Sequence, residues 1–428
     1  MGYGKRLIGA EERRRQQYMG IRERIQDPNI LRIFAATFAL GLAYGMAISL
    51  IAVFLDQRGF GKDDIGSLAA WFAMGIVLLS LPMGSLIERY SAKTTLVVAL
   101  AGYAVTVATF PFLESYAAIA AVRLLDGACS VGVWVSSETI LLSRAGRKDK
   151  AFVTSLYAIM VAVGYVVGPI FARGLSSVAP YAVVFVVAGV IALGASVFVG
   201  LKLERSLPAA ECPAPGGVAS IAGPARRILW RIKNSCYAAF AYGYFQASVV
   251  LFLPLYLIES KGVQAEQTIL MPAYFAAGML LFSNLGGRIG DRRGHLAVMR
   301  LLAAVGVSMI LGFVYLESFL WMAVAVFVAG ASLATISPLS LALQGVVVSH
   351  AEYARANSIY NAFYAAGMLL GPPISSALFA RHGGGLMLYH LAALWMGFVV
   401  FSVVFYRDDP ASRSGVLRAQ APQGTAAD

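Results

Sequence analysis

Charged residues are scarce in this sequence. Asp, Glu, Lys and Arg make up 13% of its 428 residues, whereas about a quarter of the residues of soluble globular proteins are charged. Hydrophobic residues make up 59% of the chain, and the mean hydropathy is +0.72. This composition excludes an ordinary soluble domain and indicates a chain that lies in a lipid bilayer.

Cysteine and histidine are also rare, with three and four residues respectively. Neither type shows the spacing of a metal site. Cys129 and Cys236 lie in apolar runs and Cys212 lies between two such runs, so we interpret all three as structural and expect no disulfide framework, metal or cofactor. The sequence also lacks a nucleophile–base set and a phosphate-binding loop, and we therefore expect no enzyme.

Long apolar runs are abundant. A helix needs about 20 apolar residues to cross the hydrocarbon core, whereas a barrel strand needs only about 10. The run lengths therefore exclude a barrel and predict an all-α membrane protein with twelve transmembrane helices. We expect these helices at 33–55, 65–87, 94–113, 115–143, 151–172, 174–201, 234–258, 267–287, 296–316, 318–349, 356–380 and 383–406.

The chain repeats itself at an offset of 203 residues. The offset pairs Gly127 with Gly330 and the dipeptide Gly168-Pro169 with Gly371-Pro372, without a gap over more than a hundred residues. A fixed register of this length indicates two copies of one unit. The predicted organisation is a basic cytoplasmic segment (1–32), a six-helix bundle (33–203), a flexible cytoplasmic linker rich in proline and glycine (204–232), a pseudo-symmetric second bundle (233–408) and a disordered cytoplasmic tail (409–428).

Lys and Arg are distributed unevenly over the predicted loops. With both termini on the same side, 28 of the 34 basic residues fall on that side and five on the other. The positive-inside rule then predicts that both termini are cytoplasmic. The net charge of +12 is mostly this topology signal. It does not indicate a nucleic-acid site, and we expect the basic N-terminus to lie against anionic headgroups of the bilayer.

The fourth predicted span carries three ionisable residues, Arg123, Asp126 and Glu138. A charge within the bilayer costs at least about 2.5–3.5 kcal/mol, so their presence requires a reason. One interpretation is structural: Arg123 pairs with Asp126, and Glu138 braces the cytoplasmic end by pairing with Arg89 or Arg144. The other is functional: an acid in a wet cavity exchanges a proton during transport. The second copy has lost these charges, because the same positions hold Val326, Ala329 and Leu341.

Polar and aromatic residues in three spans are candidates for lining a substrate cavity. Tyr237 and Tyr244 fall on one side of the seventh span, where packing between helices is an equally good interpretation. The full set of candidates is Trp134, Tyr237, Tyr244, Gln246, Asn357, Asn361 and Tyr364.

Two motifs occur in both copies. The first is a charged, glycine-containing loop motif, interpreted as a gate, at Gly84, Glu88 and Arg89 and again at Gly287, Asp291, Arg292 and Gly294. The second is a glycine–proline motif, interpreted as a helix bend with close packing, at Gly164, Gly168 and Pro169 and again at Gly367, Gly371 and Pro372.

Together with Arg123-x-x-Asp126-Gly127, these motifs resemble those of the major facilitator superfamily over about residues 30 to 408. The resemblance implies a monomeric secondary transporter that moves a small solute by alternating access. It also implies a bacterial inner membrane, or an intracellular membrane derived from it, as the location. The glycine–proline motif of the fifth span is similar to that of proton-coupled drug antiporters and implies efflux. The chain departs from the family pattern at Glu88, where Asp is usual, at Ser91, where Gly is usual, and in the first span, which has no acid.

Two alternatives remain open at the level of sequence. One is a transporter of iron or another metal complex in a specialised bacterial membrane. The other is a non-transporting scaffold or receptor built on the same fold.

Overall fold

The computed structural model describes residues 27–80, 82–144, 150–204, 224–348 and 352–410. Most of the expected basic segment, most of the linker and nearly all of the expected tail lie outside these ranges. Within them the chain is helical, and it contains twelve helical segments that are long and apolar enough to span a membrane. The prediction of twelve transmembrane helices is confirmed.

The first half comprises α3 to α10. Its helices are α3 (Pro28–Ile48), α4 (Ile51–Gln57), α5 (Lys62–Ser80), α6 (Met83–Tyr90), α7 (Ala92–Thr109), α8 (Tyr116–Arg144), α9 (Lys150–Ser176) and α10 (Tyr181–Lys202). The first span is divided into α3 and α4. The second ends at Ser80, earlier than expected, and Pro82 precedes the separate short helix α6.

The second half comprises α11 to α19. Its helices are α11 (Pro224–Arg231), α12 (Lys233–Lys261), α13 (Ala265–Thr268), α14 (Met271–Arg293), α15 (His295–Phe313), α16 (Phe319–Ala329), a π-helical turn (Gly330–Ala334), α17 (Thr335–Val347), α18 (Tyr353–His382) and α19 (Gly384–Val404). The described end of the linker thus forms the helix α11. The tenth span contains a π-helical turn before Pro338, a local irregularity that is frequent at functional sites.

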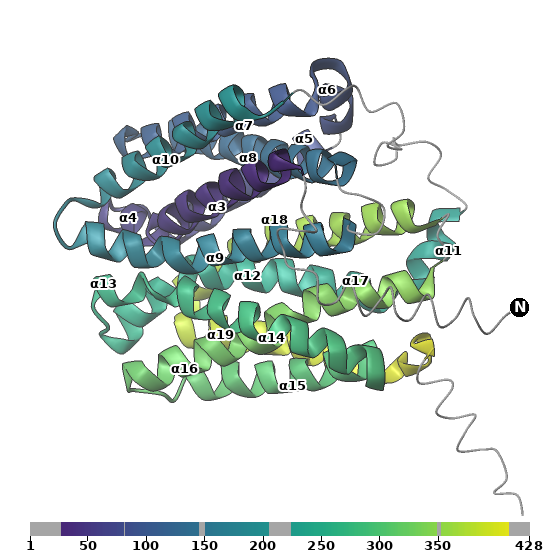
Figure 1. The fold of residues 1–428 in the computed structure, drawn as a ribbon. Helices are drawn as coiled ribbons and strands as arrows, with labels where there is room; N and C mark the ends of the chain where they lie inside the picture. Colours follow the sequence, from purple (N-terminus) through teal and green to yellow (C-terminus); the bar gives the residue numbers. More distant parts are fainter. Residues whose placement is uncertain (1–26, 81, 145–149, 205–223, 349–351, 411–428) are drawn as a thin grey trace, which may run out of the picture.

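The two halves form two layers of roughly aligned helices (Figure 1). Inside the first half, α3 packs on α9 through glycines. A Cβ added to Gly41 would lie 3.2 Å from the Cα of Gly164, and one added to Gly45 would lie 3.2 Å from the carbonyl oxygen of Gly164. The second half packs α12 on α18 in the same way, with Gly371 against the backbone of Tyr244. The glycine–proline motif therefore allows close contact within each half.

The halves meet where α5 contacts α18 and where α9 contacts α14. We call the end that holds Asp27 and Asp409 the terminal face and the opposite end the distal face. At the distal face Lys62 Nζ lies 2.8 Å from Glu259 Oε1, and Gly66 packs so closely on α18 that an added Cβ would lie 2.7 Å from Ser376 Cβ. The halves are therefore in close contact at this end.

Ion pairs at the terminal face join residues of the same half. In the first half Arg144 binds Asp27 at 2.9 Å. In the second half Arg231 binds Glu352 at 3.0 Å, and Lys233 binds Asp408. Among the residues that the structure describes, Lys62–Glu259 is the ion pair that links the two halves.

Candidate substrate and proton site

The Arg123–Asp126 pair lies inside the first half. Arg123 donates to Asp126 Oδ2 at 2.5 Å, one turn further along α8. The guanidinium also lies over the ring of Phe72 of α5, with its carbon 4.4 Å from the ring centroid. The side chains are 15% and 7% exposed, so each charge depends on the other for compensation. Removing one partner from such a buried pair typically costs about 3–5 kcal/mol.

Asp126 lines a small cavity in the first half. Neither Asp126 Oδ1 nor the hydroxyl of Tyr103 has a hydrogen-bond partner among the protein atoms, and both residues line the same cavity with Tyr44 and Arg123. The cavity has a volume of about 30 Å³. This is room for about one or two water molecules beside the polar groups of Asp126, Arg123 and the tyrosines, although apolar side chains such as Ile48 and Phe110 also line the cavity. Asp126 therefore has one carboxylate oxygen that Arg123 does not use.

Glu138 lies 12 residues further along α8, toward the terminal face, and its side chain is exposed. Neither of its expected partners pairs with it. Arg144 binds Asp27, and the guanidinium of Arg89 lies over the ring of Tyr90, 5.3 Å from its centroid. Within the described ranges, no Lys, Arg or His pairs with Glu138. Tyr157 of α9 lies close enough for electrostatic interaction.

A row of tyrosines crosses from this pair to the second half. Tyr44 stacks on Tyr103 with centroids 6.3 Å apart and meets Tyr165 edge-on at 5.3 Å. Tyr165 of α9 interacts electrostatically with Tyr364 of α18, across the boundary between the halves. Tyr364 in turn lies 6.1 Å from Tyr242. We call these five residues the tyrosine row; they come from five different helices.

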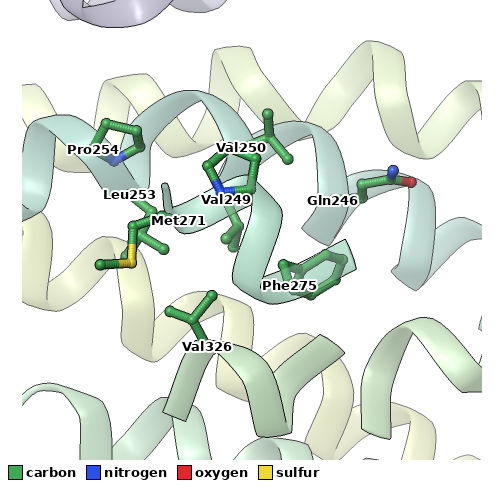
Figure 2. Close-up of a pocket in the computed structure, with 9 residues that line it drawn as sticks. Gln246, Val249, Val250, Leu253, Pro254, Met271, Phe275 and Val326 are labelled. Carbon is green, nitrogen blue, oxygen red and sulfur yellow. The ribbon is translucent and has the colours of Figure 1, made fainter. Parts of the chain in front are cut away.

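Gln246 continues the row into the second half. Its side-chain oxygen accepts a hydrogen bond from the Tyr364 hydroxyl at 3.0 Å. Gln246 also lies at one end of an apolar hollow between α12, α14 and α16, with Pro254 at the other end (Figure 2). Phe275 and Val326 line this hollow, and at the 203-residue offset they correspond to Phe72 and Arg123. The second half thus has an apolar hollow where the first half has its cation.

The structure brings only part of the predicted cavity set together. Gln246 and Tyr364 join the tyrosine row. Tyr237 donates to the carbonyl oxygen of Leu394 at 3.2 Å, and the hydroxyl of Tyr244 lies 3.2 Å from His390 Nε2, so both point to α19 within the second half. Both hydroxyls therefore make contacts between helices of the second half. Of the remaining candidates, Trp134 and Asn357 are half-buried, and Asn361 is exposed.

Four members of the tyrosine row were not predicted from the sequence: Tyr44, Tyr103, Tyr165 and Tyr242. A usable signal was present, because a phenol hydroxyl in a membrane span needs a partner or a cavity. Tyr165 even lies inside the glycine–proline motif, next to Gly164. The sequence does not show that these rings converge, since this depends on how five helices pack.

The loop motif has the same backbone shape in both halves. Gly294 is the residue immediately before α15 and has a φ of +94°. Ser91, at the equivalent position immediately before α7, has a φ of +77° and a ψ of 150°. Asp291 Oδ1 lies 3.3 Å from His295 Nε2 one turn away, and Arg292 is exposed. Gly84 and Gly287 are half-buried, and the side chain of Glu88 lies outside the described part of the structure.

Comparison with known proteins identifies the family. The model of the Major Facilitator Superfamily matches residues 33–343 and 296–427. The uncharacterized MFS-type transporter YcaD of Escherichia coli O7:K1 is 22% identical over 370 residues, which cover 85% of this chain and 92% of YcaD.

Solved structures show the same fold. The nucleoside transporter NupG, as its D323A mutant, superposes with a TM-score of 0.77 at 13% identity, over 88% of this chain and 100% of that one. A bacterial homolog of the human lysosomal transporter Spinster, inward-facing and unoccupied, gives 0.72 at 14% identity, over 89% and 98%. With twelve spans, two six-helix halves and a matching family model, this chain belongs to the Major Facilitator Superfamily of membrane transporters.

Proposed function

We propose that this protein is a proton-coupled exporter of small organic solutes that works by alternating access. Alternating access requires two halves that enclose a site and open to one side at a time. The contact of Lys62 with Glu259 and of Gly66 with Ser376 closes the distal face, and the described ion pairs of the terminal face hold each half separately. With the terminal face assigned to the cytoplasm by the positive-inside rule, we interpret this arrangement as an inward-facing state.

The tyrosine row supports an organic solute with an aromatic or apolar part and a hydrogen-bonding group. Ring faces of Tyr44, Tyr165 and Tyr364 offer stacking surfaces, and Gln246 offers a carboxamide next to an apolar hollow. Nucleosides, the solutes of the nucleoside transporter NupG, combine an aromatic base with hydroxyl groups. They are therefore included among the first compounds to test, beside planar aromatic dyes.

Asp126 is the proposed proton-binding group, and the geometry of its pair with Arg123 is the observation that carries the proposal. The acid is buried, it lines a small cavity together with Tyr44 of the tyrosine row, and its second oxygen has no hydrogen-bond partner among the protein atoms. Protonation would weaken its attraction to Arg123 and free the guanidinium to interact with the solute or with the tyrosine hydroxyls. Glu138, about 18 Å further along the helix, is a second acid, and Glu138→Gln in the transport assay below distinguishes its role from that of Asp126.

The test is transport in proteoliposomes under an imposed pH gradient, with compounds first selected by thermal stabilisation of the purified protein. Asp126→Asn is expected to abolish gradient-driven transport, whereas Glu317→Gln, which alters an exposed acid in the loop between α15 and α16, is the matched control and should transport normally. Because Asp126→Asn leaves Arg123 unpaired, the double variant Arg123→Met/Asp126→Leu replaces the whole pair by apolar groups and should fold. Gradient-driven transport by either Asp126 variant contradicts the proposal.

The two alternatives receive less support. Within the described residues, no group of three His, Cys, Asp or Glu side chains lies close enough to hold a metal ion, so the observations favour an organic solute over a metal complex. A receptor that does not transport has no need for two halves that are in contact at the distal face while the ion pairs of the terminal face stay within each half. Metal uptake by the same proteoliposomes would favour the metal-complex transporter. The absence of any transport, together with specific capture of a partner, would favour the receptor.

A further inference from the structure

A polar cluster of three buried side chains and the half-buried His390 lies in the second half, apart from the tyrosine row. His390 of α19 has its Nε2 atom 3.2 Å from the hydroxyl of Tyr244 of α12 and 3.3 Å from the hydroxyl of Ser375 of α18. Ser375 donates to Ser248 of α12 at 2.8 Å. Both serines are fully buried and Tyr244 is 5% exposed. We call these four residues the His390 cluster.

The fold does not require this cluster. At the 203-residue offset, Tyr244 and Ser248 correspond to Gly41 and Gly45, while Ser375 and His390 correspond to Ala172 and Val187. The first half therefore builds the same contacts between its helices without any polar side chain at these four positions. Polar groups within the membrane are costly, and an ionisable one there is by default evidence of a function.

The hydrogen bonds of the cluster can accommodate two protonation states of His390. When Nε2 carries no proton, it accepts a hydrogen bond from the Tyr244 hydroxyl, and the Ser375 hydroxyl donates a hydrogen bond to Ser248. When Nε2 carries a proton, it donates to the oxygen of Tyr244 or Ser375, each of which has a free lone pair. Only hydroxyl hydrogens have to rotate between the two states, so the surrounding helices need not separate.

No charged group in the described structure fixes the state of the imidazole. Tyr244 is the titratable side chain in contact with His390. Among the described residues of α12, α18 and α19, no Asp, Glu, Lys or Arg pairs with His390. On the neighbouring α15, Arg300 binds Ser402, 12 residues further along α19. Histidine is the side chain whose charge normally changes near neutral pH.

The His390 cluster adjoins the contact between the halves. Ser375 faces His390, and the next residue, Ser376, faces Gly66 of the first half, where an added Cβ would lie 2.5 Å from Ser376 Oγ. These residues follow Pro372 and Pro373 on α18, where the missing backbone N–H groups weaken the helix. A charge on His390 therefore acts on the segment of α18 that closes the distal face.

We infer that His390 is a second proton-binding site, and that its protonation changes the stability of the distal contact between the halves. This site is separate from Asp126, lies in the other half, and does not depend on Asp126 binding a proton. The ligand is the proton itself, taken up at Nε2 and held by the oxygens of Tyr244 and Ser375.

The first test is a pH titration by NMR of the full-length protein in lipid nanodiscs, with isotope-labelled histidine and His390→Gln for assignment. The His390 signal is expected to titrate between about pH 5 and pH 8. Tyr244→Phe, which keeps the histidine but removes one of its hydrogen-bond partners, is expected to shift the midpoint. An imidazole that stays in one state over this interval overturns the inference.

The second test measures the distal contact. Spin labels at Val178 and Glu317, exposed residues in distal loops of the two halves, report the separation after the native cysteines are replaced. The separated population is expected to change over the same pH interval in the parent protein and in His382→Gln, an exposed control at the distal end of α18. The component of the pH dependence that has the same midpoint as the His390 NMR titration should be lost in His390→Gln. Its persistence in His390→Gln, or its absence from the parent, contradicts the inference.

Discussion

Loss of Lys62 should open the distal face. Lys62 makes two contacts with the second half: an ion pair with Glu259 at 2.8 Å and a position over the ring of Phe379, 4.8 Å from its centroid. The paired side chains are 22% and 37% exposed, so the ion pair is expected to contribute about 0.5–1 kcal/mol. The cation–π contact adds about 0.5–1 kcal/mol.

These magnitudes give different expectations for the two partners. Because about 1.4 kcal/mol corresponds to a factor of ten in an equilibrium constant, Lys62→Met should raise the ratio of distal-open to distal-closed molecules by about tenfold. Glu259→Gln removes only the ion pair and should raise it by about two- to fivefold. The exchange Lys62→Glu/Glu259→Lys restores the pair but not the contact with Phe379, and should give an intermediate ratio.

The assay is the distance distribution between spin labels at Val178 and Glu317, measured in nanodiscs for each variant. High salt should reduce the differences, because exposed charges are screened. The reasoning is refuted if Lys62→Met leaves the distribution unchanged, or if the charge exchange opens the distal face as far as Lys62→Met does.

Three further predictions concern stability. Ser91→Gly should stabilise the protein by about 1 kcal/mol, because it relieves a strained positive φ, whereas Gly294→Ser should destabilise it; denaturant titrations in detergent that show the opposite order would contradict this. Gly164→Ala should destabilise the protein by about 1–3 kcal/mol by pressing on the backbone of Gly41, and Gly174→Ala, with open space around it, is the matched control for the same titration. Burial raises the pKa of Asp27, but hydrogen bonds from Asn29 and Arg144 outweigh it and hold that pKa below its usual value. Asp27→Asn should therefore cost about 1 kcal/mol at pH 7 and progressively less as the pH falls below 4; an equal cost at pH 7 and pH 3 would exclude this role.

The sequence was sufficient for the fold because the membrane imposes strict rules. Apolar run length determines the number of spans, and the repeat offset divides them into two halves. The sequence also indicated where helices pack closely. Glycines spaced four residues apart allow a neighbouring backbone to approach, and Gly164 and Gly168 contact the backbone of Gly41 and Gly45.

The candidate site could be predicted only in part. The sequence showed that Arg123 and Asp126 are one turn apart, and the structure pairs them. It could not show that Tyr44 and Tyr165 meet edge-on, or that Tyr244 faces α19 and not the boundary between the halves. These facts depend on the rotation of each helix about its axis, which is determined by packing between segments far apart in the chain.

The central claim is that the solute binds between the halves, along the tyrosine row. It can be tested directly by photolabelling the protein in proteoliposomes with a photoreactive derivative of a transported compound and identifying the labelled peptides by mass spectrometry. The account predicts labels on both halves, at or beside Tyr165 in α9 and Tyr364 in α18, that an excess of the unmodified compound prevents. Labels confined to one half, or located on exposed outer positions such as Val98 and Leu301, would contradict it.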